Sequence, residues 1–449
     1  IISQRFLFVF TQNYFTRSFF EFRLKTTIIC VKMEQEVNSM NYLTKQAAMK
    51  NAGDDILKIS GMAHKAKLEN PDVVNATVGS LYTDKSKLYQ FQLINYVLAT
   101  IPNEEMFAYA QTDGGEVFKE SALKWVFRSK LSKMKNSMNI SVVATPGGSG
   151  AISNTLFNYV NAGDSILLTD IYWGPYQFMI NEIGANIVTH PMFDGSKFNV
   201  KAFKEVAENI VAKEQKLVTI INDPCHNPTG YSMTKEEWLE LISYFNSLGK
   251  RNIPVVVIYD IAYIDYSMYG QDGSREILAL LQETNEHVLN VLTFSGSKTF
   301  SVYGLRLGAQ IALSKSKKLI DDFERTALYS TRAKWSCPPK IGISILNKLM
   351  STEETEKVFV EELADARNLI QARSSIFLNE ANEVGLVMHP YKSGFFMSIP
   401  SEHPNQLVED LRKKDIYVVP MEKGIRMAVS SIPTDQMPGL AKRIKEVIE

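Results

Sequence analysis

The stretch KLVTIINDPCHNPTGYSMTKEEWLELISYFNSLGKRNIPVVVIYD, residues 216–260, decides the fold. Its ends, 216–223 and 253–260, are apolar β-branched runs that each finish in Asp, and the segment between them has helical periodicity. The helical part at 234–250 opens with a Thr followed three residues later by a Glu, which predicts a capped helix. Two continuous apolar strands joined by a helix are typical of a parallel sheet that is covered on both faces.

The same alternation continues on both sides of this stretch. Five more short apolar runs, bounded by Gly, Pro, Asp or Ser, predict strands at 140–145, 165–170, 186–191, 290–297 and 308–314. We therefore predict an α/β fold whose large domain is a mostly parallel seven-stranded sheet flanked by helices. In such a sheet, ligands bind at the carboxyl ends of the strands.

The last hundred residues have a different character and predict a smaller α+β domain. A long charged helix at 351–383 precedes short strands near 394–400, 417–420 and 425–432. The division that we expect is an extension at 1–32, an amino-terminal arm with part of the small domain at 33–90, the large domain at 91–340 and the small carboxyl-terminal domain at 341–449. The extension is rich in Phe, Arg and Lys and precedes Met33, so we read it as non-native sequence or a targeting segment.

Composition and charge narrow the class of function. The chain of 449 residues has 49 basic and 49 acidic side chains, which gives no electrostatic argument for a nucleic-acid or membrane-surface partner. No apolar run reaches the ~20 residues that span a bilayer. Its three cysteines, Cys30, Cys225 and Cys337, lie far apart, so neither a disulfide framework nor a zinc site is expected, and the six histidines show no metal-ligand spacing. We expect a small substrate, no metal and a reducing, cytoplasmic location.

Side chains suited to an anionic ligand follow several predicted strands. The glycine-rich turn at 147–150 opens a helix, so its N–H groups suit a phosphate, although such a turn also serves purely structural ends. Trp173, Asn227 and Asp260 follow three further strands. Each has a structural alternative: a core tryptophan, a loop asparagine and a helix-capping carboxylate. A buried carboxylate needs a partner, because burying an unpaired charge is costly.

The stretch SGSKTFSVYGLRLG, residues 295–308, lies at the end of the next strand and has little helix or strand signal. Lys298 would form a Schiff base with an aldehyde if neighbouring cations lowered the pKa of its ammonium group. Ser295, Ser297 and Arg306 offer hydroxyl groups and a guanidinium fork to phosphate oxygens. The stretch therefore suits an organic phosphate that carries an aldehyde.

Together these strand ends resemble pyridoxal-phosphate enzymes of the aspartate aminotransferase fold, and among them the class I aminotransferases. The resemblance extends from about residue 41 to the end and rests mainly on 295–308, on HNPTG at 226–230 and on YDIAY at 259–263. It implies pyridoxal 5'-phosphate as the cofactor of the large domain. It also implies a ping-pong mechanism, in which an amino acid donates its amino group to the enzyme and a 2-oxo acid then accepts it.

The resemblance assigns a role to each of these residues. Lys298 corresponds to the residue that forms the Schiff base and later moves a proton as general base and acid. Asp260 corresponds to the partner of the pyridine nitrogen, whose protonation strengthens the electron sink. The implied contacts with the phenolic oxygen, the ring face and the phosphate come from Asn227, Tyr263, Trp173, Gly148, Ser149, Ser295, Ser297 and Arg306.

Further motifs concern the substrate and a second copy of the chain. Arg426 resembles the arginine that holds the α-carboxylate, and Gly79 resembles the glycine near the bound substrate, where Trp173 and Asn227 would also lie. Arg332, in RAKWSCPP, resembles the arginine that reaches across a dimer interface to a distal carboxylate. Tyr109 resembles the tyrosine that reaches the phosphate of the neighbouring subunit. The resemblance thus implies a homodimer with shared active sites.

The implied reaction transfers the amino group of aspartate to 2-oxoglutarate. Two departures put the substrate range in question: Cys337 stands where aspartate-type relatives usually have Asn, and YWGPYQF lacks the polar pair that often follows the tryptophan. An aromatic amino donor and a pyridoxal-phosphate lyase on the same fold are the alternatives, because a fold does not determine the reaction. A regulator without enzymatic activity is a third, which the complete set of chemical residues disfavours.

Overall fold

The computed structural model describes residues 42–48, 50 and 55–449. The chain divides into two compact units, Ile1–Gly53 and Asp54–Glu449. In the first, the short helix α2 (Lys45–Ala48) begins after Thr44, whose hydroxyl group accepts a hydrogen bond from the backbone N–H of Ala47. The extension at 1–32 lies outside the described residues. All features below belong to the second unit.

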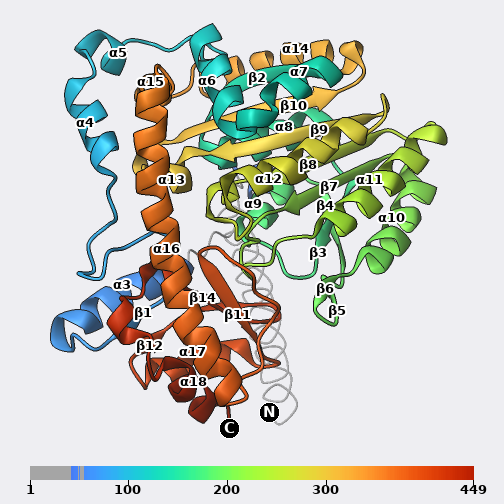
Figure 1. Cartoon of the computed structure of the whole chain (residues 1–449). Coiled ribbons are helices and arrows are strands. Elements are labelled where there is room, and N and C mark those ends of the chain that lie inside the picture. Colours follow the sequence, from blue (N-terminus) through green and yellow to red (C-terminus); the bar gives the residue numbers. More distant parts are fainter. Residues whose placement is uncertain (1–41, 49, 51–54) are drawn as a thin grey trace, which may run out of the picture. The chain divides into compact units, whose positions relative to one another are not determined.

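A seven-stranded sheet forms the centre of the second unit (Figure 1). Strand β10 runs antiparallel to both of its neighbours, and every other pair of neighbouring strands in this sheet is parallel. The predicted mostly parallel sheet is therefore confirmed. In spatial order the strands are β2 (Asn139–Pro146), β10 (Leu307–Ser314), β9 (Val288–Ser295), β8 (Val255–Asp260), β7 (Leu217–Asn222), β3 (Ser165–Thr169) and β4 (Asn186–His190).

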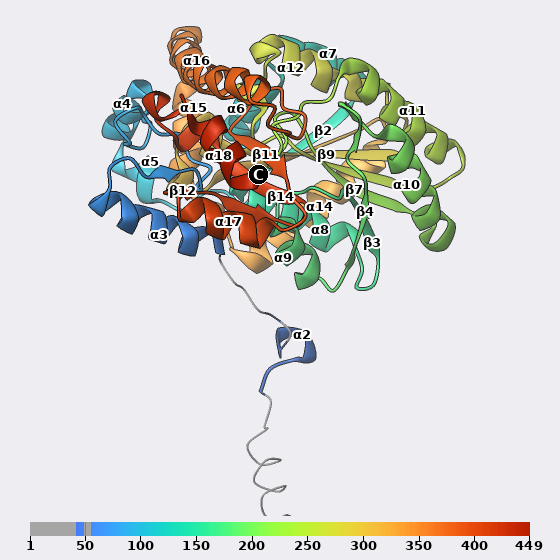
Figure 2. The same ribbon diagram turned by 90° about the horizontal axis from the view of Figure 1, so that it is seen from below.

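The central strands are apolar throughout because both faces of the sheet are covered. Along β8, Val255 and Val257 belong to one buried cluster, and Val256 and Ile258 belong to another on the opposite face. Figure 2 shows α10 and α11 on one side of the strands and α8, α9 and α14 on the other. Covering both faces removes apolar surface of the sheet from water. Each Å² of apolar surface buried in this way stabilises the fold by roughly 25 cal/mol.

The covering helices begin where the sequence indicates. In α11 (Lys235–Lys250), the side chain of Thr234 accepts a hydrogen bond from Glu237 N, and Glu237 in turn accepts one from Thr234 N, which confirms the predicted cap. The other helices around the sheet are α6 (Glu116–Phe127), α7 (Leu131–Ser137), α8 (Gly147–Tyr159), α9 (Pro175–Glu182), α10 (Val200–Glu214), α12 (Gly270–Leu278) and α14 (Lys317–Lys334).

The predicted smaller α+β part contains a three-stranded antiparallel sheet and a parallel strand pair. Its elements are α3 (Asp55–Glu69), β1 (Val74–Asn75), β11 (Phe396–Pro400), α17 (Pro404–Arg412), β12 (Ile416–Tyr417), β13 (Val419–Met421), β14 (Gly424–Ala428) and α18 (Leu440–Ile448). Residues 74–75 pair with residues 416–417, so a segment from the early part of the chain and one from the late part lie side by side in the smaller α+β part. The domain boundaries at 90 and 340 stay predictions.

The remaining helices and one further strand pair belong neither to the seven-stranded sheet nor to the three-stranded sheet. The predicted charged helix is α16 (Glu353–Glu383), which packs on α18 and on α4. The others are α4 (Gln92–Thr100), α5 (Asn103–Phe107), the strand pair β5 (Phe193–Asp194) and β6 (Lys197–Phe198), α13 (Gly296–Thr299) and α15 (Lys340–Leu349). Across the described residues, no helix combines the length and the apolar character that a membrane crossing requires.

Candidate active site

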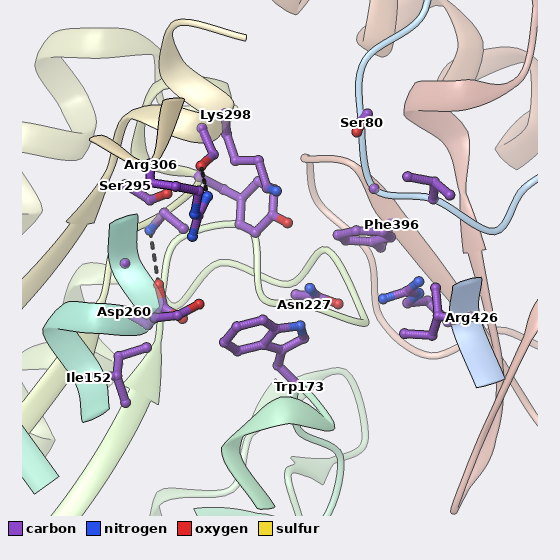
Figure 3. Close-up of a pocket in the computed structure, with 18 of the residues that line it drawn as sticks. Ser80, Ile152, Trp173, Asn227, Asp260, Ser295, Lys298, Arg306, Phe396 and Arg426 are labelled. Carbon is purple, nitrogen blue, oxygen red and sulfur yellow. Dashed lines mark hydrogen bonds between the residues drawn. The ribbon is translucent and has the colours of Figure 1, made fainter. Parts of the chain in front are cut away.

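A cavity of about 290 Å³ opens at the carboxyl ends of the central strands, between the large sheet and β11 and β14 (Figure 3). Three cationic side chains and one carboxylate line it, so its charge favours an anionic ligand. Its predicted members are Gly79, Gly148, Ser149, Trp173, Asn227, Asp260, Tyr263, Ser295, Ser297, Lys298, Arg306 and Arg426.

Sheet register explains why these residues meet. Asn222 and Asp260, at the ends of β7 and β8, lie opposite each other, and Asp260 lies opposite Thr293 of β9. Because β10 is antiparallel, its first residue, Leu307, pairs with Pro146 at the end of β2. The start of β10 therefore lies beside the carboxyl ends of its neighbours, and Arg306 joins the same edge.

Lys298 lies in α13, a single helical turn directly after β9, and its side chain is partly buried. Burial, with smaller contributions from the charges of Arg306 and Arg426, lowers the pKa of its ammonium group to about 8, and the charge of Asp260 partly opposes this shift. Its Nζ lies 4.9 Å from the ring centroid of Tyr303. At neutral pH a larger fraction of this amine is uncharged than for an ordinary lysine, so it is a better nucleophile.

Asp260 is buried at the end of β8, and burial raises the pKa of its carboxyl group. Hydrogen bonds oppose that shift: Tyr176 O–H donates to Oδ2 at 2.6 Å, and Ala262 N–H donates to Oδ1 at 3.1 Å. Asn222 Nδ2 donates to the backbone oxygen of Asp260 at 2.9 Å. A carboxylate held in this way is oriented toward the cavity and suits a cationic partner.

The glycine-rich turn forms a cup for an anion. Gly147 has φ +72°, and a Cβ there would meet the guanidinium group of Arg306, so the position favours glycine. Arg306 itself adopts a left-handed conformation, and its Nη1 donates to Ser297 Oγ at 3.0 Å. Ser149 lies in the first turn of α8, whose N-terminus carries a partial positive charge. The cup therefore presents N–H groups, hydroxyl groups and a guanidinium to one point.

Asn227 and Tyr263 form the opposite wall with Trp173. The backbone N–H of Asn227 donates to Asn222 Oδ1 at 2.6 Å, so β7 orients the loop that carries it. Oδ1 of Asn227 is buried and has no hydrogen-bond partner among the described residues. Burial raises the pKa of the Tyr263 phenol well above its ordinary value, which keeps it a hydrogen-bond donor at neutral pH.

Arg426 of β14 faces this wall from the small sheet. It is 6% exposed, and burial lowers the pKa of its guanidinium to about 10. Its Nη2 donates to Thr77 O at 2.7 Å, its Nε has no partner among the described residues, and it lies over the ring of Phe396. At Gly79, a Cβ would lie 2.2 Å from the same ring. A bound carboxylate would satisfy Nε and the charge together.

Two predicted residues do not line the cavity. Tyr109 is 93% exposed, and Arg332 is exposed at the end of α14, where its Nη1 donates to Ser336 Oγ at 2.6 Å. Both were predicted to act on a neighbouring subunit, so these positions leave that prediction untested.

Sequence reasoning missed several residues at this site. Tyr176 and Asn222 orient Asp260, and Ile56 and Leu57 of α3 line the cavity. Within the stretch YWGPYQF, which lacks the polar pair that often follows the tryptophan, Tyr176 provides a hydroxyl group to Asp260. Tyr176 lies in the first turn of α9, after a Pro at the start of the helix, and no local signal marks it as a partner of Asp260.

Comparison with known proteins agrees with this geometry. The sequence profile of the family "Aminotransferase class I and II" matches residues 71–444. The chain belongs to this family. The aminotransferase from Anaerococcus prevotii is 31% identical, with a TM-score of 0.87 over 91% of this chain and all of that one. The aspartate aminotransferase fold that the sequence resembles is therefore confirmed.

Other relatives of this aminotransferase carry more specific names. The aspartate aminotransferase of Salmonella typhi is 25% identical over 64% of this chain and 70% of its own length. The aromatic-amino-acid aminotransferase of Burkholderia pseudomallei, whose structure holds covalently bound pyridoxal phosphate, is 21% identical. Its TM-score is 0.75, and the match covers 91% of this chain and 100% of that one. Identities this low support the fold and the family and leave the substrate open.

Proposed function

We propose that this aminotransferase uses pyridoxal 5'-phosphate to transfer the amino group of aspartate to 2-oxoglutarate, as a homodimer. One observation carries the proposal: the amine of Lys298 and the buried carboxylate of Asp260 line the same cavity, together with the cup around Arg306. An amine with a lowered pKa, a buried carboxylate and an anion site are what a phosphorylated aldehyde with a basic ring nitrogen requires.

The residues present fit that cofactor. Lys298 would hold it covalently through the ε-amine, and the turn at 147–149 with Ser295, Ser297 and Arg306 would hold its phosphate. Asp260 would keep a proton on the ring nitrogen, and the side-chain amide of Asn227, with the Tyr263 hydroxyl, would contact the ring oxygen. Trp173, whose ring contacts Tyr176 edge-on at 5.2 Å, borders the same space and would stack on the ring.

The chain's own residues supply the proton chemistry. Bound pyridoxal phosphate supplies an electron sink for negative charge at the substrate's α-carbon. Lys298, whose pKa of about 8 leaves part of the amine uncharged near neutral pH, would remove the proton from that carbon as general base. Asp260 would sustain the positive charge on the ring nitrogen, and Arg426 would hold the α-carboxylate so that the proton faces the lysine.

Substrate choice in this proposal depends on Arg332 and on a second copy of the chain. Arg332 would hold the distal carboxylate of aspartate or 2-oxoglutarate in the neighbouring subunit, and Tyr109 would reach that subunit's phosphate. Support for both is their high exposure at positions away from the cavity of their own chain. Arg332 is exposed, and the hydrogen bond to Ser336 is the one that its side chain makes among the residues that the structure describes.

An aromatic amino donor is the second candidate, and the lining of the cavity favours it. Ile56, Leu57, Ile152 and Phe396 are apolar members of the cavity lining. Discrimination by one apolar contact is worth only ~1 to 3 kcal/mol, so both donor classes fit one site. A panel of aspartate, tyrosine, phenylalanine and alanine with 2-oxoglutarate decides between them, and release of ammonia in place of amino transfer would indicate a lyase.

Two further parts of the proposal concern organisation and location. We assign the seven-stranded sheet to a domain at 91–340, and the three-stranded sheet with the β1–β12 pair to a domain formed by 33–90 and 341–449. The described cysteines, Cys225 and Cys337, are free thiols, which supports a reducing compartment such as the cytoplasm.

The decisive experiment is chemical trapping of the cofactor. Borohydride treatment of the purified yellow protein, followed by peptide mapping, is expected to place the label on Lys298. Lys298→Ala is expected to abolish amino transfer while the protein still binds pyridoxal phosphate non-covalently. Label on another lysine, or unchanged turnover in the variant, would refute the assignment.

A further inference from the structure

The peptide that carries Lys298 is held by a buried network outside the cavity. Thr299, the next residue, is fully buried, and its hydroxyl group donates to Asp265 Oδ2 at 2.7 Å. Tyr266, the residue after Asp265, donates its hydroxyl group to the backbone oxygen of Lys298 at 3.1 Å. Two consecutive residues of one loop thus form hydrogen bonds with two consecutive residues of α13.

Asp265 is itself fixed by two further side chains. Arg275 Nη2 donates to Oδ1 at 2.6 Å, and both side chains are completely inaccessible to solvent. Trp125 Nε1 donates to Oδ2 at 3.1 Å, and Arg275 also donates to Trp125 O at 3.3 Å. The network therefore joins α6, α12 and the loop after β8 to the turn after β9.

The same loop also borders the cavity. It begins with Asp260, continues through Tyr263, both of which line the cavity, and ends with Asp265 and Tyr266 in a short 3-10 helix. A shift of this loop would move the carboxylate and the lysine peptide together. The loop therefore connects Asp260 to the Lys298 peptide in addition to the pairing of β8 with β9.

A buried ion pair is a weak device for stability, because apolar side chains of similar volume are often as stabilising. Its directional hydrogen bonds can instead orient a neighbouring group. Helix α13 has only four residues and no side-chain cap, so its own backbone holds it weakly. The hydrogen bonds that Lys298 and Thr299 form with residues outside the helix compensate for that weakness.

We propose that Asp265, Arg275, Thr299 and Tyr266 are positioning residues that hold the Lys298 peptide in register with Asp260. The inference rests on the proposed function, since it assumes that Lys298 carries the chemistry. None of the four side chains lines the cavity, so they act through Lys298. Displacement of a reacting group by about 1 Å can cost about 100-fold in rate.

The test uses Thr299→Val, which keeps the shape and removes the hydroxyl group, and Thr299→Ser, which restores it. The matched control is Thr284→Val. Thr284 is also fully buried, and its hydroxyl group donates to Leu281 O at 2.7 Å. It precedes the first residue of β9, whereas Thr299 follows the last residue of that strand. Both valine variants lose one buried hydroxyl group, and only one of them lies beside the lysine. Tyr266→Phe removes the second grip independently.

Steady-state kinetics of the holoenzymes should separate the two valine variants. We expect kcat of Thr299→Val to fall about 10- to 100-fold with KM for 2-oxoglutarate within about threefold, because a reacting group is misplaced and the substrate site is intact. Thr299→Ser should lie within about threefold of wild type, and Tyr266→Phe should lose activity in the same pattern. Thr284→Val should keep wild-type kcat.

A second measurement follows Lys298 without cofactor. The pH dependence of its labelling by an amine-directed reagent in the apoprotein, read by peptide mass spectrometry, reports its ionisation beside Arg306, Asp260, Arg426 and the rings of Tyr263 and Tyr303. A loosened turn gains water, so the midpoint in Thr299→Val should move upward. Thr284→Val should leave it unchanged.

The outcomes distinguish this inference from the function on which it rests. Wild-type kcat and an unchanged labelling midpoint in both Thr299→Val and Tyr266→Phe would overturn the positioning role, as would equal losses in Thr284→Val. Full activity of Lys298→Ala would instead overturn the proposed function. An inactive Lys298→Ala with unaffected Thr299→Val and Tyr266→Phe would leave the function standing and reject the positioning network.

Discussion

Replacing Tyr176 with Phe should weaken the site in a way that depends on the charge of Asp260. The hydroxyl group of Tyr176 donates to Oδ2 at 2.6 Å, and both side chains are buried, so water cannot replace the bond. A hydrogen bond to a charged group is worth about 1.5–3 kcal/mol, and one between neutral groups about 0.5–1.5 kcal/mol. We expect the Tyr176→Phe apoprotein to lose the larger amount when Asp260 is ionised and the smaller amount when it is protonated.

The sign of the pH dependence follows from the direction of the shift. Burial raises the pKa of Asp260 above its ordinary value, and loss of the Tyr176 hydrogen bond raises it further. At acid pH, Asp260 is protonated in both folded proteins, so the variants differ least. As pH rises through the raised pKa of Asp260, the difference in the free energy of unfolding grows, and it reaches a plateau above the pKa in the variant.

Urea unfolding of the two apoproteins at several pH values, at one protein concentration, measures this difference. Tyr259→Phe is the matched control, because the hydroxyl group of Tyr259 is buried on the same strand as Asp260 and has no partner among the described residues. Its removal should cost nothing or stabilise the fold. An equal loss in both variants, or a loss in Tyr176→Phe that does not vary with pH, would refute the reasoning.

Three further predictions concern the substrate, the anion cup and the lysine. Arg332→Ala should lower kcat/KM for aspartate about 100-fold and that for alanine far less, because removing one partner of a buried charge pair costs about 2–5 kcal/mol. Arg325→Ala is the control, and equal losses for both donors in Arg332→Ala would reject a distal clamp. Gly147→Ala should weaken cofactor binding at least about tenfold, because its Cβ meets a guanidinium; Gly163→Ala, also at positive φ but in open space, should not. Covalent capture of pyridoxal phosphate by Lys298 in the apoprotein should accelerate as pH rises through about 8, and a midpoint near that of ordinary lysines would contradict the lowered pKa.

Much of the fold could be predicted because it depends on local pattern. Continuous apolar runs such as 253–260 have few alternatives to a buried strand, and Thr234 with Glu237 marks the start of α11 through a bond between near neighbours in the sequence. Residues of the cavity were found for a related reason. Trp173, Asn227 and Lys298 follow strands of the large sheet, and the carboxyl ends of parallel strands meet at one edge.

Residues that act from a distance in sequence could not be found in this way. Tyr176 precedes Asp260 by 84 positions and Thr299 follows Asp265 by 34, and nothing local indicates that either pair is bonded. A tyrosine in the first turn of a helix is ordinarily a packing residue. Its role here depends on the order of β3, β7 and β8 in the sheet, which periodicity alone does not determine.

Strand direction shows most clearly what the sequence pattern leaves open. The run at 308–314 predicts a strand but not its direction, and Arg306 precedes it. β10 has eight residues, so a parallel β10 would place Arg306 about 25 Å from the carboxyl edge, at ~3.3 Å per residue. The antiparallel direction instead brings Leu307 opposite Pro146, and Arg306 reaches the cup at Gly147. The eight-residue spacing from Lys298 to Arg306 is thus productive only because the chain reverses between β9 and β10, so a lysine and an arginine at this spacing indicate a phosphate site only in a sheet with that reversal.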